Sequence, residues 1–297
     1  MQFCRAQSLD AALEYLAEWG ADGCLLAGGT DVMVRYNKSE IAPGAIIHIE
    51  GIEPLSLITT HGRTTIGALN THRGLAGDAA IAARHPAMAS AARLVGGWQT
   101  QAVGTLGGNI CNASPAADLA PPLLVADAHV TLASMRGERR LPLDEFFIDR
   151  RVTARRADEL LTTIDLEPLP EGSAEVYLKL GRRGAMDVAI AGLAVRLSLQ
   201  EDGSVGAARV AVCSLAATPR RVPEAEALLL GARLEDDALA AAGQALAGAV
   251  SPIDDARGIL TGPDDSATRY FESKMTNPLS AKMRPIVERE LSETDAF

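Results

Sequence analysis

The chain has little cysteine, and none of it is arranged to bind a metal. Its 297 residues include 4 cysteines, at Cys4, Cys24, Cys111 and Cys213, and no two of them form a C-x-x-C pair. This spacing excludes a zinc ribbon and a chain-borne iron–sulfur cluster, and it predicts free thiols. The 5 histidines are scattered as well, so we assign no metal ligand.

Positive charge is also scarce. The chain has 28 Lys and Arg residues against 38 Asp and Glu residues, which gives a formal net charge of −10. An acidic chain repels a phosphate backbone, and this excludes nucleic acid as the main partner. A phosphorylated small ligand would therefore be held mostly by backbone N–H groups and by one or two chosen cations.

Long apolar runs are missing too. The apolar run at residues 119–126 is far shorter than the ~20 residues that cross a bilayer. The N-terminus lacks the basic and apolar segments of a signal peptide. We therefore expect a cytoplasmic protein that does not span a membrane. The composition is globular, with 47% hydrophobic and 22% charged residues, and with 4% aromatic residues the core has to rest on small and aliphatic side chains.

Apolar periodicity and turn residues predict helices and strands in both halves of the chain. A helix is expected to begin after Ser8 and to end at Gly20, and a helical stretch at residues 72–96 is expected to break near Pro86. The predicted strands are residues 24–28, 45–49, 55–59, 64–69, 128–134, 139–143 and 159–166, then, after a linker at 167–173, 176–180, 188–199 and 208–215. Further helices are expected at 223–232, 235–250 and 265–293.

Two glycine motifs follow apolar segments. In the first, at residues 25–32, Gly28 ends a strand that we predict to be buried, and Gly29 follows it. In the second, at residues 104–110, Gly107 and Gly108 occupy a similar place. Glycines let a loop adopt positive φ and let N–H groups converge on an anion. An ordinary tight turn explains either motif alone, but the pair favours a ligand with two phosphates. Neither motif is a Walker A or a G-x-G-x-x-G sequence.

Two charged residues are candidates of a second kind. Asp118 ends a polar stretch that either forms turns and caps a helix or accepts hydrogen bonds from sugar hydroxyls. Lys179 lies at the end of an alternating strand; it is either part of a solvated cationic turn that pairs with Asp187 or a cation aimed at a nucleotide. No G-x-S-x-G motif and no Cys–His pair marks a nucleophile, so we assign no catalytic residue. Any redox chemistry then belongs to an organic cofactor.

Together the motifs resemble those of a known family. LLAGGTDVMV, followed by GTLGGNICNASPAADLAPPLLVADAHVTL and then by KLGRRGAMDVAIAGLAV, looks like the FAD-binding, or medium, subunit of the molybdenum hydroxylases. That family includes the medium subunit of carbon monoxide dehydrogenase and the FAD domain of xanthine dehydrogenase. The resemblance covers residues 1 to about 280.

The resemblance implies an α+β fold. A two-subdomain FAD-binding domain of the vanillyl-alcohol-oxidase/PCMH type would occupy residues 1–172, with subdomains at about 1–53 and 54–172. A smaller domain with an antiparallel three-stranded sheet and helices would follow at 173–297.

The resemblance also implies that the pyrophosphate of FAD lies between the two glycine motifs. It further implies which residues contact FAD. These are Leu25, Leu26, Ala27, Gly28, Gly29, Thr30, Asp31, Val32, Val95, Thr105, Leu106, Gly107, Gly108, Asn109, Asp118, Leu161 and Lys179. The sequence departs from many relatives at two places: Gln101 and Ala102 stand where Arg and Asn are usual, and Val95 stands where some relatives place an aromatic residue near the flavin.

The implied function is electron transfer. A small subunit with [2Fe–2S] clusters and a large subunit with the molybdenum cofactor would be the partners, with a dimer of heterotrimers, a heterohexamer, as the assembly. This chain would carry FAD and pass electrons from the clusters to an external acceptor. The substrate would be chosen by the large subunit: an N-heteroaromatic compound, a purine, an aldehyde or carbon monoxide. An acyl-CoA is less favoured, because the chain lacks a cysteine-rich insertion.

Two other functions stay open at this point. The chain could be a self-sufficient FAD-dependent oxidoreductase of the PCMH type, although its short, Ala-rich C-terminal part disfavours a substrate domain. It could also be a nucleotide-binding or scaffold protein without catalytic activity.

Overall fold

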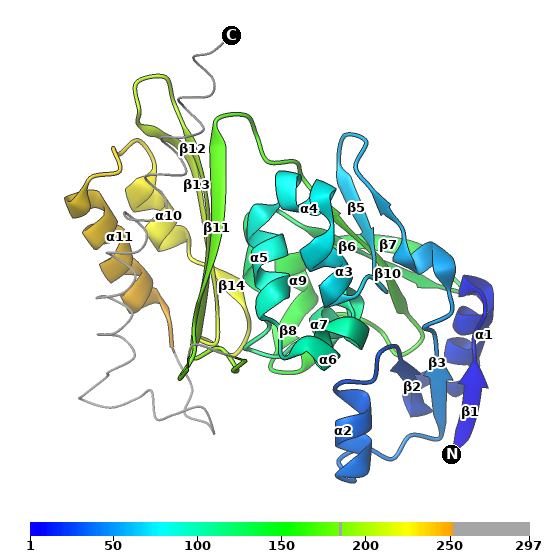
Figure 1. Cartoon of the computed structure of the whole chain (residues 1–297). Helices are drawn as coiled ribbons and strands as arrows, with labels where there is room; N and C mark the ends of the chain where they lie inside the picture. Colours follow the sequence, from blue (N-terminus) through cyan, green and yellow to red (C-terminus); the bar gives the residue numbers. More distant parts are fainter. Residues whose placement is uncertain (184–185, 252–297) are drawn as a thin grey trace.

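Three main sheets follow one another along the chain (Figure 1). The computed structural model describes residues 1–183 and 186–251. The predicted closing helix at 265–293 lies outside the described residues. None of the described helices is long and apolar enough to cross a membrane.

The N-terminal sheet is small and parallel. Its strand order is β1 (Gln2–Arg5), β3 (Ala45–His48) and β2 (Gly23–Leu26), so β2 is an edge strand. Helix α1 (Leu9–Trp19) buries its apolar side against this sheet. Because β2 has a partner on one side only, its side chains are half-buried rather than buried, and the prediction of a buried strand before the first glycine motif was wrong.

The ends of α1 confirm two sequence predictions. The hydroxyl of Ser8 accepts a hydrogen bond from the N–H of Ala11 at 3.2 Å, which is the expected N-cap contact. Gly20 ends the helix with a φ of +49°, a conformation that favours glycine.

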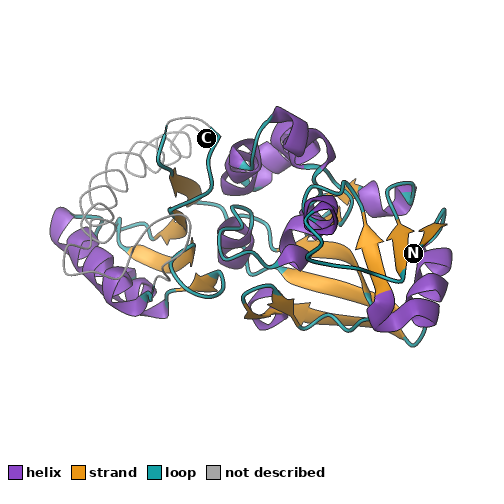
Figure 2. Cartoon of the chain, turned by 90° about the horizontal axis from the view of Figure 1, so that it is seen from below, coloured by secondary structure: helices purple, strands orange, loops and turns teal. Residues whose placement is uncertain are grey.

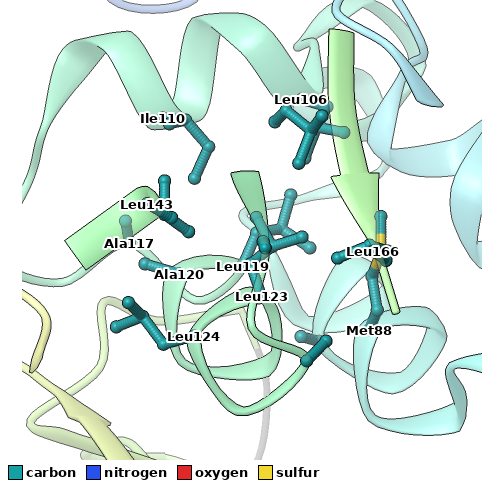
Figure 3. Packing of buried hydrophobic residues seen from close by; sticks show 14 of the residues in the cluster. Met88, Leu106, Ile110, Ala117, Leu119, Ala120, Leu123, Leu124, Leu143 and Leu166 are labelled. Atoms are coloured by element: carbon teal, nitrogen blue, oxygen red, sulfur yellow. The ribbon is translucent and has the colours of Figure 1, made fainter. Parts of the chain in front are cut away.

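The central sheet is antiparallel and carries the largest core. Its strands, in spatial order, are β4 (Ile58–Thr59), β5 (Thr64–Gly67), β10 (Leu160–Leu166), β6 (His129–Ser134) and β7 (Gly137–Pro142). Buried aliphatic side chains of this sheet pack against those of the helices that follow β5 (Figure 3). As the composition predicts, alanine, leucine, isoleucine and valine make up most of this core.

The helical stretch after β5 has three helices where two were predicted. They are α3 (His72–Gly77), α4 (Ala79–Arg84) and α5 (Pro86–Leu94). The break at Pro86 is confirmed. The additional break arises at Asp78, whose carboxylate accepts the N–H of Ile81 at 2.9 Å and so begins a new helix.

Three more helices follow before β6, and a short helix and hairpin follow β7. The first group is α6 (Trp98–Val103), α7 (Leu106–Asn112) and α8 (Ala120–Val125). The second is α9 (Leu143–Phe146) with strands β8 (Phe147–Asp149) and β9 (Val152–Thr153). Helix α2 (Val32–Asn37) follows the first glycine motif.

The C-terminal sheet is antiparallel, and Figure 2 shows it at one end of the molecule with helices on its outer side. Its strands are β11 (Ser173–Leu180), β12 (Ala191–Leu199), β13 (Val205–Cys213) and β14 (Arg220–Arg221). Helices α10 (Pro223–Leu229) and α11 (Asp236–Ala249) follow. The prediction of three strands holds for the three long ones. The fourth strand has only two residues, too few to give a periodic signal.

The two faces of the C-terminal sheet belong to different cores. The face that includes Ala174 and Leu193 packs with α10 and α11. The opposite face includes Tyr177, Ala194 and Ala211, which join the core of the central sheet. The C-terminal sheet therefore packs directly against the helices of the central part.

Candidate cofactor site

The structure brings the two glycine motifs into direct contact. A Cβ atom added at Gly28 would lie 1.7 Å from the carbonyl oxygen of Val103 and 3.0 Å from the nitrogen of Gly104. No side chain fits there, so glycine is required by close approach of two backbones. Gly29 has a φ of +71°, which confirms the positive φ expected in the first motif.

A side-chain contact joins the motifs at a second place. The Nδ2 atom of Asn112 donates to Oδ1 of Asp31 at 2.9 Å. Because Asn112 ends α7 while Gly104 precedes that helix, residues 28–31 run alongside α7 between these two contacts. We call this junction of residues 28–31 with residues 103–112 the glycine seam.

The backbone N–H groups of the first motif are free of protein acceptors among the described residues. Among the described residues, the N–H groups of Gly28, Gly29, Thr30 and Asp31 have no hydrogen-bond acceptor. Most of these residues are half-buried rather than covered. Since backbone N–H groups need a partner, a cluster of open ones in a glycine turn suits an anionic oxygen.

The second motif differs from the predicted loop, because its glycines lie inside helix α7. The hydroxyl of Thr105 caps this helix by accepting the N–H of Gly108 at 3.1 Å. The N–H groups of Leu106 and Gly107 donate to Asn70 and Ala68 carbonyls, each at 2.8 Å. The expectation that this motif, like the first, presents a set of open amides at positive φ was therefore wrong for residues 106–108.

The second motif instead allows close helix packing and offers one unpartnered polar atom. A Cβ at Gly107 would lie 2.7 Å from Cβ of Ala68, so this glycine lets α7 pack tightly on the segment after β5. The Oδ1 atom of Asn109 is buried, and it has no hydrogen-bond partner among the described residues. An unpartnered buried oxygen is costly, and a donor group of a ligand would satisfy it.

Three apolar candidates are half-buried rather than fully covered. Leu25 and Leu26 are half-buried on the edge strand β2, and Val95 is half-buried directly after α5. Leu161 differs, because it lies on the central strand β10 with an exposure of 2% and packs in the main core. Its side chain can offer only apolar surface, and its assignment to the adenine stays a prediction.

Asp118 and Lys179 contact each other in the interior. Nζ of Lys179 lies 2.8 Å from Oδ2 of Asp118, and their side chains are only 8% and 7% exposed. Oδ1 of the same carboxylate accepts the hydroxyl of Tyr177 at 2.6 Å. Burial raises the pKa of Asp118, against the opposing influence of Lys179. In this arrangement both carboxylate oxygens already have protein donors.

Lys179 has a second acceptor, the carbonyl oxygen of Leu94, at 2.9 Å. The lysine is therefore neither a solvated turn residue nor a partner of Asp187, whose carboxylate accepts the N–H groups of Arg182 and Val188. A direct contact of Asp118 or Lys179 with a nucleotide stays a prediction.

Two cysteine thiols, one on β2 before the first motif and one on α7, have raised pKa values. Burial raises the pKa of Cys24 on β2, while the charges of Arg35 and Arg155 act in the opposite direction. Burial also raises the pKa of Cys111 on α7, and Arg155 again opposes it. Arg155 therefore acts electrostatically on Cys24 of β2, which precedes the first motif, and on Cys111 of α7.

Two residues in this region were not singled out as ligand contacts by the sequence. They are Asn112, which lies in the polar stretch that ends at Asp118, and Arg151. Nη1 of Arg151 donates to Oδ1 of Asn112 at 3.1 Å, so the guanidinium is joined through that amide to Asp31. No local pattern marks Arg151, because the contact spans 39 residues of sequence.

Comparison with known families agrees with this geometry. A family model described as "FAD binding domain in molybdopterin dehydrogenase" matches residues 1–169, more than half of the chain. The chain belongs to this family. A second model, "CO dehydrogenase flavoprotein C-terminal domain", matches residues 176–259. A third, for a protein family of unknown function, DUF4197, matches residues 226–297 and overlaps the second.

Relatives with curated names are members of the same group. The chain is 32% identical over 84% of its length to the 6-hydroxypseudooxynicotine dehydrogenase complex subunit alpha of Paenarthrobacter nicotinovorans, and it covers 84% of that protein. It is 33% identical to the putative xanthine dehydrogenase FAD-binding subunit XdhB of Escherichia coli, over 84% of this chain and 85% of that protein. It is 30% identical to the carbon monoxide dehydrogenase medium chain of Hydrogenophaga pseudoflava, over 85% and 88%.

The fold matches as well. A structure of the H. pseudoflava carbon monoxide dehydrogenase lacking the Mo-pyranopterin moiety of its cofactor has a chain that superposes with a TM-score of 0.86 at 29% identity, covering 93% of this chain and 94% of that chain. A Cu,Mo-CO dehydrogenase in its cyanide-inactivated form gives a TM-score of 0.85 at 27% identity, covering 93% of each chain. The family, the relatives and the fold identify the chain as an FAD-binding medium subunit of molybdenum-containing oxidoreductases, whose relatives work as parts of multi-subunit enzymes.

The residues present fit the family's cofactor. The first motif offers open amides for a diphosphate, and Asn109 offers an unpartnered buried oxygen. Leu25 and Leu26 on the edge strand β2 are half-buried, so part of their apolar surface is available to a ligand.

Proposed function

We propose that this chain is the electron-transfer subunit of a molybdenum hydroxylase. In this proposal it takes electrons from the [2Fe–2S] clusters of a small partner subunit and passes them to an external acceptor. Bound FAD supplies the chemistry, since a flavin exchanges one or two electrons at a time. The observation that carries the proposal is the glycine seam, with its open amides, in a chain of the FAD-binding family.

The chain's own residues bind and orient the cofactor. The amides of Gly28 to Asp31 would hold the diphosphate, and the carboxamide of Asn109 would meet a polar group of the dinucleotide. Apolar side chains at Leu25, Leu26 and Val95 would exclude water beside it. We assign no catalytic acid or base, because the proposed role moves electrons rather than protons at a substrate.

The wider organisation is part of the same proposal. The cofactor domain would be residues 1–172, with subdomains at about 1–53 and 54–172, and residues 173–297 would form the second domain. The complex would be a dimer of heterotrimers with a large molybdenum subunit, located in the cytoplasm. Native mass measurement of the purified complex tests the stoichiometry.

The test of the function uses a close contact at the seam. In Gly28→Ala, the added methyl group would overlap the backbone of Val103, so the seam must open and FAD content should fall well below that of the wild-type complex. Gly77→Ala is the matched control, because nothing lies within 4 Å of its added Cβ. Bound flavin is measured by absorbance, and electron flow by anaerobic reduction through the partner clusters.

The outcomes separate the alternatives. A wild-type complex without flavin, or a Gly28→Ala complex with full flavin and normal electron flow, would contradict the proposal. Turnover of a small substrate by the isolated FAD-loaded chain would favour a self-sufficient oxidoreductase.

A further inference from the structure

The glycine seam contains an acid that opposes the binding of a diphosphate. Between residues 23 and 37 the only acidic side chain is Asp31, and residues 103–115 carry no charge at all. The carboxylate of Asp31 faces the seam residue Asn112 at 2.9 Å. A diphosphate beside Asp31 would meet like charge unless a cation offsets it.

Lys179, the cation that the sequence suggested, is not available for this role. Its side chain is 8% exposed, and its ammonium group contacts the carboxylate of Asp118 at 2.8 Å and donates to the carbonyl of Leu94 at 2.9 Å. To reach a phosphate it would have to leave a buried carboxylate without its counterion, which is strongly unfavourable.

Arg151 meets the requirement. It lies in the turn between β8 and β9, is exposed, and forms no ion pair with any described carboxylate. One guanidinium nitrogen donates to Oδ1 of Asn112 at 3.1 Å, and this leaves most of its donors free, since a guanidinium has five N–H groups. Asn112 thus contacts Asp31 with its amide nitrogen and Arg151 with its oxygen.

The backbone holds Arg151 at this place. The N–H of Arg151 donates to the carbonyl of Ala113 at 3.0 Å, directly after α7. Both residues have positive φ, +59° for Arg151 and +44° for Ala113, a conformation that costs energy in residues other than glycine. The β8–β9 turn is therefore attached to the end of α7 that contacts the first motif.

We propose that Arg151 is a cofactor-binding residue, which supplies the positive charge for the diphosphate of FAD at the Asp31 end of the glycine seam. Asn112 positions its guanidinium and at the same time holds Asp31. This inference rests on the proposed function, because it assigns a residue to that same cofactor site. Arginine suits the role, since its planar fork donates to phosphate oxygens.

The experiment uses the full chain, purified with its partner subunits and freed of flavin. FAD is titrated into wild type, Arg151→Gln and Arg150→Gln by following flavin fluorescence, at several salt concentrations. Arg150 is the matched control, because it is the adjacent exposed arginine and its side chain forms no hydrogen bond or ion pair with a seam residue. Riboflavin, which has no phosphate, and ADP, which has the diphosphate without the flavin, are the second and third probes.

We expect Arg151→Gln to raise the Kd for FAD and for ADP about tenfold at low salt, the size of a lost charge-assisted hydrogen bond. In this variant the dependence of log Kd for FAD on the logarithm of the salt concentration should become shallower. The Kd for riboflavin should not change. Arg150→Gln should stay within about twofold of wild type. Arg151→Lys should keep the salt dependence, and Asn112→Ala should weaken FAD binding less than Arg151→Gln.

Equal FAD affinity and equal salt dependence in Arg151→Gln and Arg150→Gln would overturn the assignment of Arg151 while the proposed function stands. An equal loss for riboflavin and FAD would also overturn it, since the residue would then act through the fold. A wild-type complex that binds neither FAD nor ADP would overturn both proposals.

Discussion

Glu175 and Lys179 lie on the same face of β11 and contact opposite ends of helix α5. Oε1 of Glu175 accepts the N–H of Ala87 at 3.1 Å in the first turn of α5, and Nζ of Lys179 donates to Leu94 at 2.9 Å, the last residue of that helix. Four residue steps of strand span about 13 Å, and the seven steps from Ala87 to Leu94 span about 10 to 11 Å of helix, so the two contacts are of similar length.

The signs of the two charges suit the helix. The positive end of the α5 dipole meets a carboxylate, and the negative end meets an ammonium group. Because Val95 follows directly after Leu94, the C-terminal sheet fixes the position of a segment that the sequence assigns to the flavin. These contacts join the C-terminal sheet to the cofactor-binding part.

Removing the charge of Lys179 should destabilise the protein strongly. In Lys179→Met, Asp118 would stay buried without its counterion, and we expect a loss of about 3–5 kcal/mol in the free energy of unfolding. Urea denaturation measures it. Lys38→Met is the control, because Lys38 is exposed and its side chain has no ion pair with described residues. Adding Asp118→Asn to Lys179→Met should restore part of the loss; no recovery would contradict the buried-pair interpretation.

Substitution of Glu175 tests the contact at the N-terminal end of α5. Its second oxygen contacts Nη2 of Arg196 at 2.7 Å, with the two side chains 1% and 8% exposed. Glu175→Ala removes both this counterion and the acceptor for the Ala87 N–H, so amide exchange at Ala87 should accelerate. Glu175→Gln keeps an acceptor for that N–H and should protect it better, although both variants lose stability through the unpaired Arg196. Hydrogen exchange followed by mass spectrometry compares them, and equal protection in both would count against the cap.

We expect the free energy of unfolding to fall in mild acid, because two histidines are buried. Burial lowers the pKa of His85 to about 3 and that of His72 to about 4, from an ordinary 6.5. Since the folded state binds these protons less readily than the unfolded chain, the stabilisation is complete above pH 6.5 and is lost as the pH falls from there toward 4.

The expected slope is about 1 kcal/mol per pH unit for each imidazole between pH 6 and 4. Urea denaturation at a series of pH values measures it. His85→Gln should flatten the curve, whereas His61→Gln, at an exposed position, should leave it unchanged. A curve that stays steep in His85→Gln would show that other groups cause the acid sensitivity.

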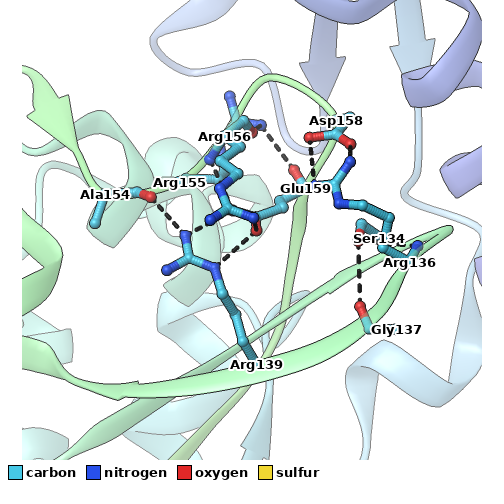
Figure 4. A network of polar contacts seen from close by, with 9 residues as sticks. All are labelled: Ser134, Arg136, Gly137, Arg139, Ala154, Arg155, Arg156, Asp158 and Glu159. Atoms are coloured by element: carbon cyan, nitrogen blue, oxygen red, sulfur yellow. Dashed lines mark hydrogen bonds and ion pairs between the residues drawn. The ribbon is translucent and has the colours of Figure 1, made fainter.

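Glu159 organises a network of arginines on the central sheet (Figure 4). Its carboxylate accepts hydrogen bonds from Nε and Nη2 of Arg139, at 2.7 and 2.8 Å, and from the backbone N–H of Arg156, at 2.7 Å. Burial alone would raise the pKa of Glu159, but these donors outweigh it and lower the pKa below its ordinary value.

Glu159→Gln should cost about 1–3 kcal/mol, because it removes the charge from a bidentate contact whose arginine is partly exposed. Thermal unfolding measures the loss, with Glu138→Gln, an exposed site on β7, as the control. The difference between Glu159→Gln and wild type should shrink as the pH falls below about 4.5, where the unfolded carboxyl group takes up a proton. A difference that is constant with pH would mean that the charge is not involved.

The sequence by itself determined the elements whose causes are local. Ser8 and Gly20 bound α1, Pro86 begins α5, and Gly29 of the first motif adopts the expected positive φ, because caps and φ preferences depend on neighbouring residues. Three ordered motifs were also enough to indicate the family, which the comparisons confirmed. The described core is mostly aliphatic, as the scarcity of aromatic residues requires.

The tertiary structure decided what those residues contact. The second motif became a helix because Ala68 and Asn70 accept its first amides, and Lys179 became an interior residue because Asp118 lies 61 positions away in sequence and 2.8 Å away in space. Arg151 reaches the glycine seam through Asn112 across a gap of 39 residues. Such partners come from distant segments that meet only when hydrophobic cores pack, so no local pattern contains them.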